Sequence, residues 1–556
     1  DRSDTVRTAS KKRNTQYPRL FKNKRVVTKK GLITIHKIDD KLYFEFPKSL
    51  LGREFLMGSS ISATSDNTSG LVGQTMTTPL HIRFAIQEDQ VYMQNVTPVS
   101  RMDVYSNQSD ISKAVAKSNI TPDMESFKIA AYNMDSTAVV FEVTKFFLAD
   151  NKRLPLFDQN SSSLEDEKYG QLELKAVLKK NLSSIRNFYV FDDNLEINLD
   201  MSFYQSLLAS KKEVRGGNVR VKAVYSMLLL PEETMVWRLG DPRLGYTFTK
   251  KQKISTEKDG TAFSYLQHKW NLLPADEEAY RRGDLVAPRK PVVFYIDSDF
   301  PEAWKKAIKE GVNWWNEAFK MAGFKDAVQT ADFPANDTTF YAGNLKYSCI
   351  RYVPVNLSKT QSKVWVDPRS GEIINGTIFV GHDIAKTIAS QRFVQTAQVD
   401  ERMRGIQLSE EVLLEGIRLY VAREVGHCLG LADNASASAA FSVESLRSPE
   451  FTRQNGIASS VMDELPYNYI AQPQDGKADF IQNKLGAYDL FAIQMGYMLV
   501  PDAKTPEEIR EKIMRWVSMK SGDPVYRYGK AQYQGAEYDP SALGGDLGNN
   551  AVKAGK

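Results

Sequence analysis

The sequence contains only two cysteines and no long apolar run, and each absence excludes a class of protein. Cys349 and Cys428 cannot form the disulfide framework on which small secreted domains depend. No apolar run approaches the roughly 18 residues that a membrane-spanning helix needs, so we expect no transmembrane segment in this chain. Hydrophobic residues make up 42% of the 556 residues and charged residues 25%, which excludes a disordered, collagen-like or coiled-coil chain. A chain of this length predicts several globular domains.

Excess positive charge is absent outside the first thirty residues. Residues 1–30 contain eleven Lys or Arg and two Asp, a local net charge of +9, whereas the whole chain has +5 and the remainder therefore −4. We interpret residues 1–30 as a solvated basic tail, with a membrane-surface or partner-binding arm as the alternative. No phosphate-binding glycine loop and no basic surface interleaved with aromatic residues is present, so nucleic acid is not an expected partner.

Two regions of different character follow the tail. Between residues 31 and 285, segments such as KLYFEFP and LHIRFAIQ alternate apolar and polar residues, which predicts a β-rich region of two packed modules. Between residues 286 and 500, a short apolar strand, a long amphipathic helix, more strands and a second long helix capped by Ser409 predict a mixed α/β domain. For residues 501–556 we expect one helix and a polar extension that buries little and belongs to a truncated region.

Residues with catalytic potential lie at the end of the second long helix, in the segment REVGHCLGLAD. In the zinc-binding pattern HExxHxxGxxH, two histidines one helical turn apart and a third after a glycine turn bind the ion, and the glutamate is the general base. Glu424, His427 and Gly430 keep their places in this pattern. Arg423 stands at the first ligand position and Asp433 at the third.

The sequence around this motif resembles the large metzincin-like zinc metalloproteases of Bacteroidetes, which carry uncharacterised β-rich N-terminal domains. Met462, thirty-five residues after His427, stands where metzincins have the methionine turn beneath the metal. The resemblance extends from about residue 29 to residue 556 and includes the blocks FPKSLLGREFLMGSSISATS, FYIDSDFPEAWKKAIKEGVNWWNEAFKMAGF, VDPRSGEIINGTIF, ADNASASAAFSVESLRSPEF and GAYDLFAIQMGY. It implies an α+β multidomain fold, in which a β-rich N-terminal half precedes a metzincin-like (zincin) α/β metallopeptidase domain.

The resemblance assigns roles to individual positions and shows where this chain departs from them. Glu424 takes the general-base position, His427 and Asp433 take ligand positions, and Gly430 and Met462 take the turn positions. An aspartate binds zinc at about 2.0–2.2 Å. Arginine has five donors, no lone pair to give and a pKa above about 12. We therefore predict a degenerate member with vestigial metal positions and expect no cofactor, with zinc only if an atypical ligand set replaces the missing one.

The two departures at the metal site have opposite charges. We hypothesise that the Arg423 guanidinium lies in the former metal cavity and pairs with Asp433 or with Glu424. Removing one partner of a buried pair costs about 3–5 kcal/mol, so Arg423→Ala should destabilise the fold. The alternative is that both residues drifted after activity was lost, without any replacement of the ion.

These observations favour a catalytically inactive metallopeptidase homologue, or pseudopeptidase, with a binding or assembly role at the bacterial cell envelope. Its expected partner is a peptide or protein in the former substrate cleft, added as an extra strand along an edge strand formed by Thr377, Ile378, Phe379 and Val380. One alternative is an active zinc metallopeptidase that uses His427, Asp433 and one unforeseen ligand. Another is a structural docking component of an outer-membrane complex. The resemblance implies an exported protein, periplasmic or at the outer membrane or cell surface, with a lipid anchor left open.

The remaining histidines give no second metal site in the sequence. They are scattered and are interpreted as structural, with His382 as an unfavoured rescuing ligand, and comprise His36, His81, His268 and His382. Cys428 is expected to face away from the metal positions and pack in the core. Trp314 and Trp315 are also expected to pack.

Overall fold

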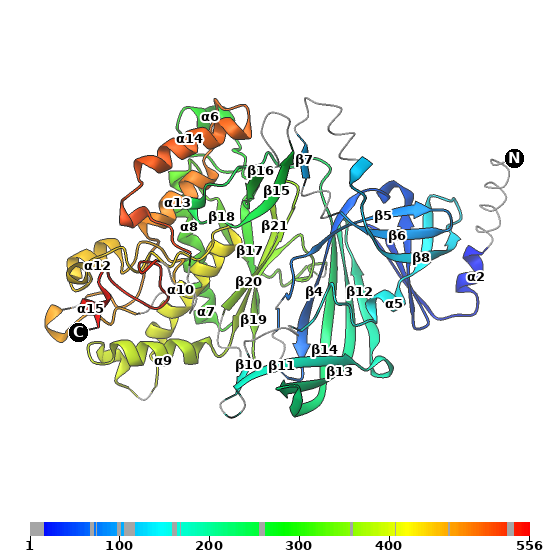
Figure 1. The fold of residues 1–556 in the computed structure, drawn as a ribbon, viewed down its shortest axis with the longest axis horizontal. Coiled ribbons are helices and arrows are strands. Elements are labelled where there is room, and N and C mark those ends of the chain that lie inside the picture. Colours follow the sequence, from blue (N-terminus) through cyan, green and yellow to red (C-terminus); the bar gives the residue numbers. More distant parts are fainter. Residues whose placement is uncertain are drawn as a thin grey trace. The chain divides into compact units, whose positions relative to one another are not determined.

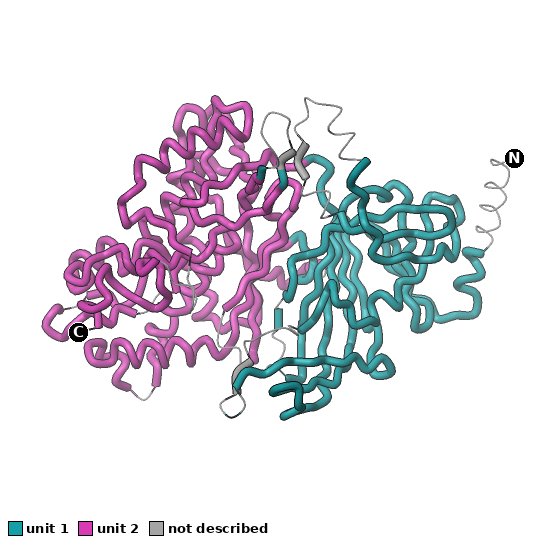
Figure 2. The backbone as a smooth tube through the Cα atoms, viewed as in Figure 1, with its two compact units in different colours: residues 1–233, 252–262, 341–346 teal, residues 234–251, 263–340, 347–556 magenta. Residues whose placement is uncertain are grey.

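The chain, seen in a computed structural model, divides into two compact units (Figure 2). Unit 1 comprises residues 1–233, 252–262 and 341–346, and unit 2 comprises residues 234–251, 263–340 and 347–556. The structure describes residues 16–66, 72–73, 75–96, 102–104, 117–157, 164–166, 168, 170–254, 262–337, 339–355, 360–405, 407–464, 467–476, 478–530 and 539–555.

Unit 1 is built mainly of antiparallel strands (Figure 1). Its elements are α2 (Tyr17–Phe21), β1 (Val26–Lys30), β2 (Thr34–Ile38), β3 (Lys41–Pro47), β4 (Glu54–Thr64), β5 (Leu80–Gln87), β6 (Gln90–Asn95), β7 (Met102–Val104), β8 (Asp123–Tyr132), β9 (Ala138–Glu142), α5 (Thr144–Phe147), β10 (Leu164–Asp166), β11 (Gly170–Leu178), β12 (Ser184–Val190), β13 (Asn194–Ala209) and β14 (Lys212–Leu229). Within the described residues, thirteen of these strands form one sheet in the order β1-β2-β3-β9-β8-β6-β5-β4-β14-β13-β11-β10, with β12 paired to β13.

The alternation that predicted strands in this region places side chains on both faces of the sheet. Phe44 and Phe46 of β3 lie in the main core, where the Phe46 ring centroid is 4.8 Å from that of Phe84. Tyr43, on the opposite face, joins a smaller cluster with Ile38 that α2 covers. The sequence-based prediction of a β-rich N-terminal half is therefore confirmed.

Unit 2 contains most of the described helices and a mixed sheet. Its elements are β15 (Phe248–Ile254, shared with unit 1), β16 (Ala262–Gln267), α6 (Glu277–Arg281), β17 (Val292–Ile296), α7 (Glu302–Asn313), α8 (Trp315–Met321), β18 (Val328–Asp332), β19 (Ser348–Val353), β20 (Thr360–Val366), β21 (Ile373–Gly381), α9 (Ile384–Thr396), α10 (Glu410–Cys428), α11 (Val443–Leu446), α12 (Pro449–Asn455), α13 (Ala487–Tyr497), α14 (Pro506–Met519) and α15 (Ala551–Ala554). In the described part of the chain, the sheet has the order β18-β17-β19-β21-β20, parallel except for β20. The α+β fold class predicted from the sequence is confirmed.

The prediction that residues 377–380 form an edge strand is wrong. Thr377 and Val380 lie in β21, which pairs with β19 on one side and with β20 on the other. The chain passes through β20 first and returns through a tight turn at residues 367–371, so the earlier strand of this hairpin takes the outer position. β20 is therefore the edge strand of the described sheet on this side.

The two long helices predicted in this region are present and cross closely. Ser409 caps α10 by accepting a hydrogen bond from the Val412 amide, as its position predicts. The predicted first helix is divided at Trp314 into α7 and α8. A Cβ atom on Gly311 of α7 would lie 2.6 Å from the Arg418 carbonyl oxygen of α10, so only glycine permits this approach. α10 also packs against β20 and β21 (Figure 1).

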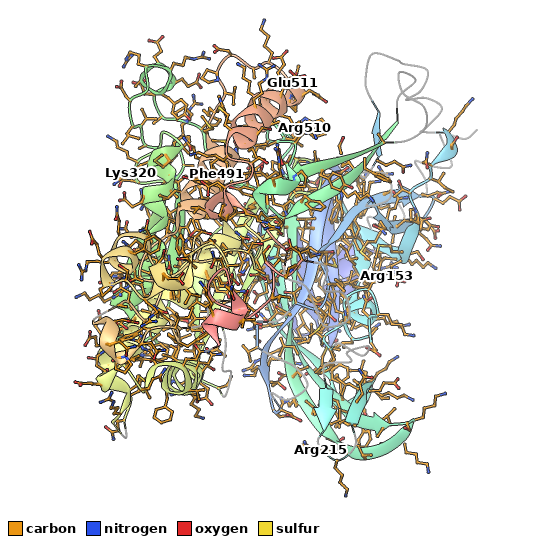
Figure 3. The ribbon with its side chains drawn as sticks, turned by 60° about the vertical axis from the view of Figure 1, so that its left-hand side comes forward. Arg153, Arg215, Lys320, Phe491, Arg510 and Glu511 are labelled. Carbon is orange, nitrogen blue, oxygen red and sulfur yellow. The ribbon has the colours of Figure 1, made fainter. Side chains whose placement is uncertain are left out.

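The C-terminal part of unit 2 buries more than its polar composition predicts. The amphipathic helix expected after residue 500 is α14, which buries Ile513 and Val517 and exposes Arg510 and Glu511 (Figure 3). Residues 539–549 then run along the chain that follows α10. There Gly548 donates its amide hydrogen to the Ser438 carbonyl oxygen at 2.9 Å, and Ala542 and Leu547 are each 1% exposed. The small residues of this segment allow its backbone to pack closely against the chain after α10. A prediction based on the number of polar residues does not detect such packing. Across the described ranges, no helix is both long and apolar enough to cross a membrane.

Candidate functional site

A glycine turn after α10 returns the chain to the last turn of that helix. Gly430 has a φ of +95°, and a Cβ atom there would lie 2.2 Å from the His268 carbonyl oxygen. Its own carbonyl accepts a hydrogen bond from the Thr247 amide at 2.8 Å. The position therefore requires glycine for both its conformation and its space, and the turn brings Asp433 back beside His427.

A buried methionine supports the same turn of α10. Met462 is fully buried, and a Cβ atom on Gly426 would lie 2.2 Å from its sulfur and 2.7 Å from the Trp315 ring. The helix therefore rests directly on Met462, next to His427. Trp315, predicted to pack, is itself buried and donates its indole hydrogen to the Ala422 carbonyl oxygen of α10 at 2.8 Å.

A buried aspartate holds the methionine turn in place. Asp489 of α13 accepts hydrogen bonds from the Ser460 hydroxyl at 2.5 Å, the Val461 amide at 2.9 Å and the Gly486 amide at 2.8 Å. The Ser460 hydroxyl oxygen in turn accepts from the Met462 amide at 3.0 Å. Burial raises the pKa of Asp489 to about 7, against these donors, which lower it. The turn thus depends on one carboxyl group from another helix.

At the centre of the site, one carboxylate oxygen of Asp433 contacts both Arg423 and His427. Arg423 donates from Nη2 to Asp433 Oδ1 at 2.6 Å, and His427 Nε2 lies 3.2 Å from the same oxygen. His427 Nδ1 lies 2.9 Å from the Leu431 carbonyl oxygen. Glu464 is more distant, with its carboxylate 3.9 Å from Arg423 Nη2. Three of the motif positions therefore converge, with a guanidinium among them.

Of the two partners that the sequence left open for Arg423, the structure places Asp433 against it. Glu424 is 4% exposed and instead accepts a hydrogen bond from the Thr360 hydroxyl of β20 at 3.0 Å. Burial raises the pKa of Asp433, but the hydrogen bond from His427 and the charge of Arg423 outweigh burial and hold this pKa below its ordinary value. Asp433 is therefore an anion at neutral pH and faces a cation.

The residues at this site do not fit a zinc ion. His427 and Asp433 offer a nitrogen and an oxygen donor, but the first ligand position carries a guanidinium, which has no lone pair and repels a cation. The Arg423 Nη2 atom already donates a hydrogen bond to Asp433 Oδ1, the oxygen that a metal ion would need as a ligand. Within the described ranges, no group of three or more His, Cys, Asp or Glu side chains is arranged to hold a metal ion.

A cavity of about 580 Å³ lies beside Arg423. It is lined by Thr360, Ile384, Thr387, Gln391, Gln395, Leu419, Tyr420, Arg423, Val461, Asp463, Glu464, Tyr467, Ile481, Gly544 and Gly545. Gln391 accepts from the Tyr420 hydroxyl at 3.1 Å, and Gln395 accepts from the Tyr467 amide at 2.6 Å. Both amide oxygens are engaged, so the amide NH₂ groups are the ends that can donate to a ligand.

The two glutamines of α9 were missed in the sequence. They stand four residues apart, which places them on one face of the helix, but α9 has no clear apolar stripe to show which face lines the cavity. The spacing of Gln391 and Gln395 in SQRFVQT was the available signal.

A buried acidic residue in the cavity wall gives the site a pH dependence. Asp463 is 3% exposed and accepts from the Ser438 amide at 2.9 Å, while the Ser438 hydroxyl donates to Asp546 at 3.0 Å. Burial, followed by the Asp546 charge, raises the pKa of Asp463 to about 6. The folded state therefore holds this proton more tightly than the unfolded state does.

We expect Asp463→Asn to weaken the pH dependence of stability. Because the folded pKa of Asp463 is raised, its contribution is full below about pH 4 and is lost as the pH rises through about 6. Between about pH 5 and pH 8 the variant should lose less unfolding free energy than the wild type. Urea unfolding of both proteins at the two pH values measures this difference, and equal losses would contradict it. Asp489 has a pKa of about 7 and titrates in the same pH range, but it is present in both proteins. The difference between wild type and variant therefore reports on Asp463.

The other histidines and Cys428 lie in hydrogen-bonded or packed positions. His382 contacts the Tyr352 hydroxyl at 2.6 Å and stacks on Trp304, and neither of these residues belongs to the His427 site. His268 contacts two threonine hydroxyls, and burial lowers its pKa to about 4. In unit 1, His36 and His81 contact glutamates. Cys428 is fully buried, and burial raises its pKa.

Comparison with known proteins agrees with this geometry. Residues 405–556, which contain α10, the glycine turn and Met462, match the sequence model of a family described as Met-zincin. Residues 73–275 and residues 15–64 match two domains of unknown function, DUF5117 and DUF5118. No curated protein and no solved structure matches the chain. The C-terminal part of unit 2 is therefore a metzincin-like domain.

Proposed function

We propose that the metzincin-like domain binds peptide or protein segments in its cleft and does not hydrolyse them. The observation that carries this proposal is the hydrogen bond from Arg423 to Asp433 at 2.6 Å. A metallopeptidase needs a metal ion to polarise the scissile carbonyl and to generate hydroxide near neutral pH. A guanidinium at the first ligand position removes that ion. Glu424 then has no metal-bound water to deprotonate.

The cleft supports an extended peptide as the ligand. β20 is the edge strand of the described sheet, and edge strands accept an additional strand through main-chain hydrogen bonds. Thr360 of β20 also lines the cavity beside Arg423, so a strand added there has a side-chain pocket within reach. The glutamine amides of α9 and the Arg423 guanidinium supply donors for carbonyl or carboxylate oxygens of such a ligand.

A cavity-filling substitution tests the proposed binding. Gln391→Trp places a large ring in the cavity, and Ser390→Trp, one residue earlier on α9 and outside the cavity lining, is the matched control. In a fluorescence assay with a random peptide library, binding to Gln391→Trp should weaken by at least about tenfold, since filling a ligand pocket removes its central contacts. Binding to Ser390→Trp should stay at the wild-type level. Equal binding by all three proteins would contradict the proposal.

An activity assay separates this proposal from its alternatives. The wild-type chain should leave casein intact, with or without added zinc, and Glu424→Ala should behave in the same way. Zinc-dependent cleavage that Glu424→Ala abolishes would instead establish an active metallopeptidase with an atypical ligand set. Peptide-independent attachment to envelope proteins through unit 1 would favour the docking role. The exported, envelope-associated location implied by the resemblance belongs to the same proposal, and fractionation of the native cells tests it.

A further inference from the structure

The two remaining ligand positions keep the spacing of a metal site. His427 Nε2 and Asp433 Oδ1 are 3.2 Å apart. Two donor atoms held at about 2.0–2.1 Å by a tetrahedral ion are separated by roughly 3.3 Å. An ion at tetrahedral distances from both atoms therefore requires almost no movement of either side chain.

His427 also keeps the orientation that a metal ligand needs. Its Nδ1 atom lies 2.9 Å from the Leu431 carbonyl oxygen, which only accepts hydrogen bonds. Nδ1 therefore carries a hydrogen, and Nε2, which donates to Asp433 in the wild-type chain, is the atom whose hydrogen a metal ion would replace. A carbonyl behind the ring fixes the tautomer and the ring plane of metal-binding histidines in the same way.

Position 423 faces the same point as His427. The two residues are four apart on α10 and so share a helix face, and both side chains reach Asp433 Oδ1. In the described structure Arg423 Nε is buried without a hydrogen-bond partner. Gly426 and Met462 continue to support this turn of the helix from the other side.

We infer that the Arg423 guanidinium takes the place of the metal ion as the counter-cation of Asp433, and that the rest of the metal site is retained. The single substitution Arg423→His then creates a His-His-Asp site for a divalent transition metal such as Zn²⁺. The inference rests on the proposed function only in taking the wild-type site to be free of metal.

Zinc binding by purified full-length variants tests this inference. Each protein is treated with a chelator, equilibrated with zinc sulfate, separated from free zinc and analysed for its elements. Arg423→His should retain about one zinc ion per chain, and the wild type almost none. Zinc should raise the melting temperature of Arg423→His only, because a ligand that binds the folded state stabilises it. Arg418→His, five residues earlier on α10, controls for an added histidine, and Arg423→His with Asp433→Ala should lose the ion.

The outcomes are distinguishable from those of the peptide-binding test. A folded Arg423→His that retains no more zinc than Arg418→His would overturn the inference. If Arg423→His does not fold without metal, refolding with and without zinc decides, since zinc should restore folding. Failure of zinc to do so would also overturn it. Zinc gained by Arg423→His together with absent peptide binding would contradict the proposed function and leave this inference standing.

Discussion

Asp489→Ala should lower the free energy of unfolding by about 3–6 kcal/mol, because three buried hydrogen-bond donors lose their acceptor at about 1–2 kcal/mol each. The donors are the Ser460 hydroxyl and the amides of Val461 and Gly486, and the carboxyl group itself is fully buried. Ser460 also orients the Met462 amide, so the methionine turn beneath α10 should loosen with the loss. Urea unfolding followed by tryptophan fluorescence measures the change.

Glu508, an exposed acidic residue in the first turn of α14, is the matched control for Asp489. Glu508 of α14 accepts a hydrogen bond from the Lys504 amide at 2.7 Å, much as Asp489 accepts from the Gly486 amide, but it lies in solvent. Glu508→Ala should cost about 0.5–1 kcal/mol. Similar losses in Asp489→Ala and Glu508→Ala would show that Asp489 acts as an ordinary helix cap and not as the support of the methionine turn.

Gly430→Ala should destabilise the protein by about 3–5 kcal/mol, the sum of backbone strain at positive φ and a forced clash. The added Cβ atom would meet the His268 carbonyl oxygen at 2.2 Å, and a backbone atom cannot move aside as a side chain does. The turn that brings Asp433 to His427 begins at this residue, so the Arg423 pair should be disturbed as well.

Another glycine separates the clash at Gly430 from the strain. Gly522 has the same φ of +95°, but nothing lies within 4 Å of the position of its Cβ atom. Gly522→Ala should therefore cost only about 1 kcal/mol, the strain alone. Thermal or urea unfolding of both variants gives the comparison, and an equally small loss in Gly430→Ala would contradict the close approach to His268.

Local sequence patterns predicted the features of the site that depend on neighbouring residues. The cap at Ser409 and the shared helix face of Arg423 and His427 follow from spacing along one helix. Opposite charge indicated Asp433 or Glu424 as the partner of Arg423, and the structure shows Asp433. The expected cost of Arg423→Ala is nevertheless smaller than for a buried pair, because the Asp433 side chain is 45% exposed and solvent screens the pair.

Features that depend on long-range pairing could not be read from the sequence. β20 and β21 both appear as strands with a tight turn between them, but the pattern does not say which strand pairs with β19. The support of the methionine turn by Asp489 joins residues 29 positions apart, and the packing of residues 539–549 along the chain after α10 joins segments more than 100 positions apart. Such contacts leave no local periodicity, since they are made by single residues in turns and loops.

Arg423 should exclude a metal ion from the site it shares with His427 and Asp433. Elemental analysis of the native protein, purified without chelator, together with X-ray anomalous scattering at the zinc edge from its crystals, measures this exclusion. We expect no zinc above background and no anomalous peak near His427 Nε2. Stoichiometric zinc, with a peak within bonding distance of that nitrogen, would contradict it.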